Sequence, residues 1–171
     1  MTTPVGIYRI DTIGAGSLAI MAHPASSGDA ASRIAEIAAS GINQVISLLE
    51  PAEAQLLGLQ HEGELVNATG MEFVSFPIPD MGLPVSVVEF AQLSRRLYRQ
   101  AHAGSNSLIH CRAGVGRSGL LAAAVLMHEG RDAQQAFARV ARRRGMPVPE
   151  TSGQGDWLAA NQSTITDSAP G

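Results

Sequence analysis

The chain has 171 residues, which suits one compact domain, and 45% of them are hydrophobic, as is ordinary for a protein with a buried core. Its net charge of −3 gives no reason to expect nucleic acid or an anionic membrane as a partner. A single cysteine excludes an internal disulfide, and the five histidines lack the spacing of a zinc site. Without a signal peptide or an apolar run of about 20 residues, we expect a soluble cytoplasmic protein.

Five segments are predicted to be strands, and helical segments lie between them. The last three strands are apolar runs bounded by turn residues, as is typical of buried parallel strands. The predicted strands are 8–10, 17–22, 44–49, 72–78 and 107–111. The sequence therefore predicts an α/β domain with a mainly parallel central sheet, whose functional sites form where the strands end.

The helices are predicted from apolar periodicity, capping residues and terminal glycines. Their ranges are 29–40, 50–59, 62–70, 86–104, 117–129, 132–145 and 155–163. We expect one domain over residues 7–163, with a flexible N-terminus at 1–6 and a flexible tail at 164–171. The basic run at 141–145 has two interpretations: a site for a second anionic group, or a solvated helix end that complements the helix dipole.

The segment 110–119, "HCRAGVGRSG", holds the only cysteine. Cys111 ends a predicted strand and leads into a loop that runs into a helix; we call residues 111–117 the cysteine loop. Its glycines and the free amides of the helix start form a nest for an anion, and Arg117 can hold two oxygens of that anion. These positive surroundings favour the thiolate of Cys111, so a nucleophile in a phosphate cradle indicates attack on phosphorus. The alternative is that Cys111 is a small buried hydrophobic residue.

Three further side chains fit such chemistry. The Ser118 hydroxyl can donate to the sulfur, and His110 is expected to orient the loop. Asp80 lies in "FPIPDMGLP" (76–84), just past a predicted strand, where it can protonate a leaving group. The alternative for Asp80 is a role as a turn former only.

The segment 110–119 resembles the signature H-C-x-x-G-x-x-R-[S/T] of the cysteine-dependent protein tyrosine phosphatase superfamily. The chain's size and its "PIPD" loop resemble the compact dual-specificity branch, of the bacterial and kinase-associated types. The resemblance implies a sheet of four or five strands with helices on both sides, no metal and no cofactor. It also implies that Asp80, 31 residues before Cys111, is the general acid. Phosphate would be bound by the loop residues Arg112, Ala113, Gly114, Val115, Gly116 and Arg117.

The resemblance further places Gln154, in "VPETSGQGDWL", where several branches position the hydrolytic water; an exposed loop residue is the alternative. It implies removal of phosphate from phosphotyrosine in proteins through a phosphocysteine intermediate, and also from phosphoserine and phosphothreonine if the pocket is shallow. Three other functions remain open: a phosphatase for an inositol or nucleotide phosphate, a phospho-binding module without turnover, and a sulfur transferase. We expect a phosphorylated protein or a small phosphoester as partner, no nucleic acid or membrane, and a monomer.

Overall fold

The computed structural model describes residues 4–167, and its centre is one five-stranded sheet in the order β1-β2-β5-β3-β4. The first two strands, β1 and β2, pair antiparallel as a hairpin, whereas β2–β5, β5–β3 and β3–β4 all pair parallel. The strands are β1 (Tyr8–Ile13), β2 (Gly16–Met21), β3 (Gln44–Ser47), β4 (Glu72–Ser75) and β5 (Asn106–His110). The predicted mainly parallel sheet is therefore confirmed, with β1 as its antiparallel edge.

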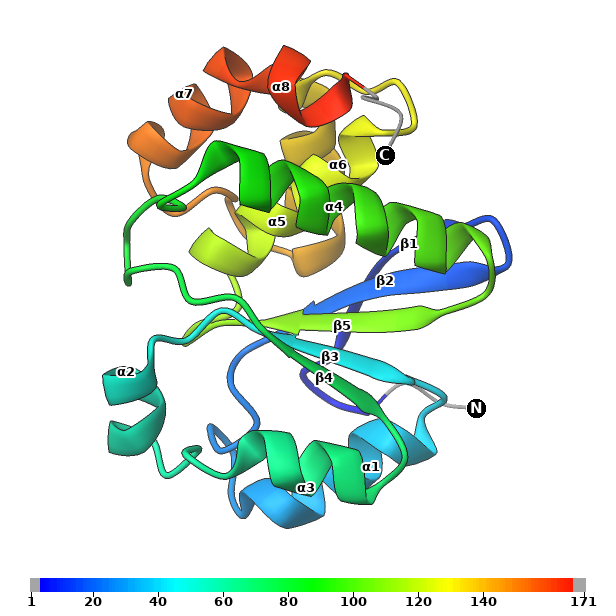
Figure 1. Ribbon diagram of the computed structural model, residues 1–171, viewed down its shortest axis with the longest axis vertical. Coiled ribbons are helices and arrows are strands. Elements are labelled where there is room, and N and C mark those ends of the chain that lie inside the picture. The colour runs from blue at the N-terminus through cyan, green and yellow to red at the C-terminus, as the bar shows by residue number, and fades with distance from the viewer. Residues whose placement is uncertain (1–3, 168–171) are drawn as a thin grey trace.

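Helices cover both faces of the sheet (Figure 1). One layer contains α1 (Ala30–Ala39), α3 (Glu62–Ala68) and, at its edge, α2 (Pro51–Leu56). The other contains α4 (Val87–His102), α5 (Gly116–Met127), α6 (Ala133–Arg144), α7 (Ser152–Ala160) and α8 (Gln162–Thr166). The buried apolar residues accordingly form two clusters, one on each side of the sheet.

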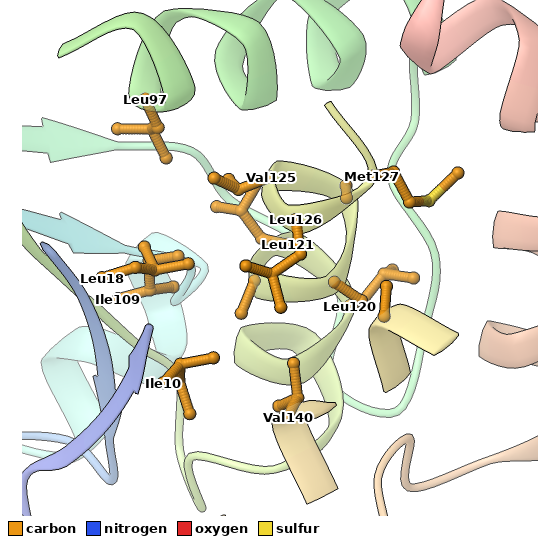
Figure 2. Close-up of a cluster of buried hydrophobic side chains, with 14 of the residues drawn as sticks. Ile10, Leu18, Leu97, Ile109, Leu120, Leu121, Val125, Leu126, Met127 and Val140 are labelled. Carbon is orange, nitrogen blue, oxygen red and sulfur yellow. The ribbon is translucent and has the colours of Figure 1, made fainter. Parts of the chain in front are cut away.

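Helix α5 is the centre of the larger cluster, and all of its residues are buried. Figure 2 shows its side chains Leu120, Leu121 and Val125 among residues of the sheet, of α4 and of α6. A helix that is apolar all round is stable only when it is covered on every side. This burial fixes α5 against the sheet, so its N-terminus stays at the carboxyl end of β5.

The C-terminal segment differs from its prediction. Thr151 caps α7, which begins at Ser152 rather than at residue 155, and α8 continues the helical chain to Thr166. Ile165 is fully buried in the larger cluster, which holds α8 against the domain. The flexible tail expected from residue 164 therefore does not begin there, while 1–3 and 168–171 of the expected termini lie outside the described residues. Within 4–167, no helix is long and apolar enough to cross a membrane.

Candidate active site

The cysteine loop lies where three parallel strands end side by side. Strand register sets His110 of β5 beside Met21 of β2 and Ser47 of β3. Cys111 follows β5 directly, and α5 begins at Gly116, so the loop joins the carboxyl edge of the sheet to a helix N-terminus, as predicted. The Cys111 side chain is 3% exposed and belongs to the larger apolar cluster.

Gly114 allows the loop to turn against the end of β2. Its φ is +70°, in the left-handed region that favours glycine, and a Cβ there would lie 2.4 Å from the carbonyl carbon of Met21. The backbone N–H of His23 donates to the Arg112 carbonyl at 3.3 Å. The backbone after β2 therefore forms one wall of the cysteine loop, and only glycine fits at this turn.

Arg117 is 2% exposed, and its guanidinium is held by a carboxylate that the sequence did not reveal. Its Nη1 and Nη2 each donate to one oxygen of Glu53, both at 2.8 Å, and Nη1 also donates to the Ile78 carbonyl at 2.8 Å. Burial lowers the pKa of Arg117, but the hydrogen bond with Glu53 and the charge on Cys111 together raise it by more. The pKa of Arg117 is therefore above its ordinary value. The same bond lowers the pKa of Glu53, so both groups are ionised.

Asp80 lies next to this arginine. Its Oδ1 accepts from Arg117 Nη2 at 3.0 Å, and its side chain is 47% exposed. The loop that carries it follows β4 and turns sharply, since the Gly82 N–H donates to the Pro79 carbonyl at 2.8 Å. The structure thus brings the predicted acid to the predicted anion-binding arginine, with one face toward solvent.

His110, the residue before Cys111, is fully buried. Like Arg117, it has an acidic partner that the sequence did not predict. Nε2 lies 2.6 Å from Oε1 of Glu62, the first residue of α3, and Nδ1 lies 3.3 Å from the Cys111 carbonyl oxygen. The two contacts fix the ring between α3 and the backbone of Cys111. Burial and the charges of His110 and Arg112 lower the pKa of the neighbouring His23, which keeps it neutral near pH 7.

Ser118 and Gln154 are both buried. The Ser118 hydroxyl has no hydrogen-bond partner among the described residues. Gln154 forms a capping box with Thr151, and its Nε2 donates to the Gly82 carbonyl at 3.3 Å. Nε2 also lies 3.2 Å from the position that a Cβ at Gly116 would occupy, so Gln154 contacts the helix end of the cysteine loop and is not an exposed loop residue.

One more carboxylate reaches the loop from the segment before α7. Oε2 of Glu150 lies 2.6 Å from the position that a Cβ on Gly116 would occupy, whereas Arg112, at the loop's start, is half-exposed and lies 4.0 Å from Glu53. Within residues 4–167, no group of three or more His, Cys, Asp or Glu side chains is arranged to hold a metal ion. Arg117 and Arg112 both supply positive charge at the loop.

The sequence around Glu53 indicates a helix start and not a partner for Arg117. Glu53 stands three residues after Glu50, which is capping-box spacing, and the two residues form a capping box at the start of α2. The pattern marks a helix start and contains no information on a residue 64 positions away. Glu62, at the start of α3, likewise gave only a helix signal.

A thiol at the head of a glycine-rich loop, with a buried arginine and an aspartate beside it on this sheet, defines a compact cysteine phosphatase of the dual-specificity type. The chain belongs to the family described as the Swiss Army Knife protein, DSP-PTPase phosphatase domain (PTP-SAK), whose model matches residues 8–163. The family and the fold together support a phosphatase, and hence a hydrolase. A search of curated protein sequences finds no match.

Solved structures show the same fold. Kinase associated phosphatase, with its catalytic-site cysteine replaced by serine, superposes with a TM-score of 0.86 at 20% identity, covering 98% of this chain and 99% of that one. Tk-PTP in its active form gives 0.75 at 27% identity, with 94% and 99% covered. PTPMT1 in complex with PI(5)P gives 0.75 at 21% identity, with 94% and 97% covered. All three cover almost the whole described domain.

Proposed function

We propose that this protein hydrolyses phosphotyrosine in proteins through a phosphocysteine intermediate. The observation that carries the proposal is the meeting of Asp80 with Arg117 at 3.0 Å, beside the loop headed by Cys111. A nucleophile, a cation and a carboxylic acid from three parts of the chain are the groups that phosphoryl transfer to sulfur needs.

In the first step, amides of the cysteine loop and the Arg117 guanidinium bind the phosphate oxygens. The Cys111 sulfur attacks phosphorus, the bond to the leaving oxygen breaks, and protonated Asp80 donates its proton to that oxygen. The phosphate dianion competes with Asp80 for Nη2 of Arg117, which frees the carboxyl group to face the leaving group. Glu53 keeps the guanidinium in place during this exchange, because its two bonds are independent of Asp80.

In the second step, water attacks phosphorus and the sulfur–phosphorus bond breaks. Asp80, now ionised, accepts the proton from that water. We assign the orientation of the water to Gln154, which contacts the helix end of the loop. The unpartnered Ser118 hydroxyl donates to the departing sulfur and stabilises it as a thiolate. The products are inorganic phosphate and the free enzyme, with the acid and the thiolate regenerated over the cycle.

The surface around Asp80 supports an aromatic phosphoester as substrate. Met81, Leu83 and Val85 follow it on the same loop and are 52%, 37% and 92% exposed. An apolar rim contacts a tyrosine ring and neighbouring peptide side chains favourably, whereas a free polyol phosphate gains little from it. Only one further basic side chain, Arg112, belongs to the cysteine loop, which argues against a substrate with several phosphates.

Turnover of para-nitrophenyl phosphate tests the chemistry. Cys111→Ser should abolish turnover, and Asp80→Asn should lower kcat about 100-fold, the ordinary effect of losing a general acid. Glu150→Gln is the matched control, because Glu150 also reaches the loop. A Cys111→Ser variant with wild-type turnover contradicts the nucleophile, and a greater loss in Glu150→Gln than in Asp80→Asn transfers the acid role to Glu150.

A substrate panel then tests the substrate class. Phosphotyrosine peptides should be hydrolysed with a higher kcat/KM than phosphoserine peptides, PI(5)P or nucleotide monophosphates. Preference for a small phosphoester overturns the protein substrate but leaves the chemistry intact. Peptide binding without phosphate release indicates a binding module, and activity on thiosulfate indicates a sulfur transferase.

A further inference from the structure

Arg144 ends α6, and its side chain reaches the cysteine loop. Its Nε donates to the Gly114 carbonyl at 2.9 Å, and its Nη2 donates to the Ala113 carbonyl at 3.3 Å. Its guanidinium carbon lies 4.0 Å from the centre of the Tyr8 ring, on strand β1. One side chain therefore joins the loop to the end of α6 and to the edge of the sheet.

The geometry of the peptide bond makes these two contacts informative. In a trans peptide the C=O and the N–H point in opposite directions. The carbonyl of Ala113 shares a peptide group with the N–H of Gly114, and the carbonyl of Gly114 shares one with the N–H of Val115. Both carbonyls face Arg144. The two N–H groups therefore point away from Arg144, toward the side of the loop where we expect the phosphate.

We propose that Arg144 is a positioning residue for the phosphate-binding amides of Gly114 and Val115. The role rests on the proposed function, because it requires that the cysteine loop binds phosphate. Arg144 acts from behind the loop through the backbone and does not contact the substrate. Its charge also draws electron density toward the two carbonyl oxygens, which makes the paired N–H groups better donors to an anion.

The loop needs such support because it is rich in glycine. Gly114 and Gly116 allow several backbone conformations, and confining them to one has an entropic cost. The planar fork of an arginine matches two successive carbonyls, and stacking on Tyr8 fixes the plane of that fork. A lysine offers one compact charge and cannot form the same pair of bonds in fixed geometry.

This role separates Arg144 from the rest of the basic run 141–145. Arg142 and Arg143 are exposed, whereas Arg144 is partly buried against the loop. Neither interpretation given by the sequence, a second anion site or a solvated helix end, covers what Arg144 does. Its partners are two carbonyl oxygens of the loop that holds the nucleophile.

The test is competitive inhibition by inorganic phosphate, together with kcat and KM for para-nitrophenyl phosphate. Arg144→Ala should raise the inhibition constant for phosphate about tenfold, which corresponds to the net value of about one hydrogen bond. KM should rise in parallel and kcat should fall. Arg144→Lys should give an increase of about threefold, because one of the two bonds is kept. Arg142→Ala removes the same charge from the same helix end and should stay within about twofold of the wild type.

Three outcomes decide the proposal. An Arg144→Ala variant that folds and binds phosphate within about twofold of Arg142→Ala overturns it, whatever its melting temperature. If Arg144→Ala does not fold, Arg144→Lys decides by the same comparison. If the wild-type protein neither binds phosphate nor turns over substrate, the proposed function fails and the positioning role fails with it. If the wild type binds phosphate and Arg144→Ala binds it equally well, only the positioning role of Arg144 fails.

Discussion

Glu53 and Arg117 form two parallel hydrogen bonds, each 2.8 Å long, although 64 residues separate them in the chain. The carboxylate fixes both the position and the plane of the guanidinium, since two bonds define a direction as well as a distance. The pair is also nearly free of solvent, since the Arg117 side chain is 1% exposed and the Glu53 side chain 9%. The position of the candidate catalytic arginine is therefore set by α2 as much as by α5.

Replacing Glu53 should impair both stability and activity. Glu53→Ala leaves a buried guanidinium without its main partner, and we expect a loss of about 3 kcal/mol in the free energy of unfolding. Glu53→Gln preserves shape and one acceptor, so it should unfold less readily than Glu53→Ala yet lose about tenfold in kcat/KM through misplacement of Arg117. Urea denaturation and steady-state kinetics measure the two effects. Glu64→Gln, on an exposed carboxylate of α3, is the control for lost charge; equal kinetics in Glu53→Gln and Glu64→Gln would contradict this role.

Gly114→Ala should be far more damaging than the same change at another left-handed glycine. At Gly114 the new Cβ meets the backbone of Met21 and Ala22 at 2.4 and 2.5 Å, so overpacking adds to the left-handed φ, for a total of about 3 kcal/mol. Gly130 has φ +93° with no atom within 4 Å of its Cβ position, so Gly130→Ala measures the backbone cost alone, about 1 kcal/mol. Thermal unfolding of both variants checks the difference, and similar losses would show that the contact with β2 is not tight.

Ser118→Ala should change the kinetics without lowering stability. The Ser118 hydroxyl is buried with no partner in the described part of the chain, so its removal should shift the free energy of unfolding by less than about 0.5 kcal/mol. If it stabilises the departing sulfur, the variant should release para-nitrophenol in a burst followed by turnover about tenfold slower than the wild type. Rapid-mixing kinetics would show the burst. If the variant releases para-nitrophenol without a burst and at the wild-type rate, Ser118 contributes only to packing.

The stability of the protein should fall in mild acid because of His128. Burial of its ring, helped by the charges of Arg95 and Arg99, lowers its pKa from 6.5 to about 4. The unfolded chain then binds this proton at a higher pH than the folded chain does. The contribution of neutral His128 is complete above pH 6.5 and is lost as the pH falls toward 4. We expect a loss of roughly 1 to 2 kcal/mol, after allowance for partial exposure of the ring.

His128→Gln isolates this effect, because glutamine cannot titrate but can still donate to the Ser94 hydroxyl, which lies 3.0 Å from Nε2. Urea denaturation at about pH 7 and about pH 4.5 should show a smaller decrease in the variant than in the wild type. Equal decreases in the two proteins would mean that other groups cause the acid sensitivity.

The sequence predicted those parts of the site that depend on local order. Cys111, Arg117 and Ser118 lie within eight consecutive residues, and their spacing is itself the signal. Asp80 was found because parallel strands end at the same edge of a sheet, so the loop after β4 had to lie near the loop after β5. Both inferences use only chain neighbours or strand order.

The parts that escaped prediction are pairings across the fold. Glu62 binds His110 across 48 residues, and Arg144 binds the Gly114 carbonyl across 30. Each of these residues also has a local interpretation, as a helix start or a helix end, which is sufficient on its own. Ile165 falls in the predicted tail at 164–171, and only the packing of α8 shows that it is a core residue.

Cys111 is both the candidate nucleophile and the sole thiol of the chain. Any reagent that alkylates or oxidises sulfur at a cysteine therefore reports on one chemical environment, with no background from a second site. The fraction of molecules that gain the mass of one label gives the fraction with a reactive Cys111. The rate of labelling measures how often the buried sulfur becomes accessible to the reagent. The same uniqueness means that a disulfide-linked form has to contain another molecule.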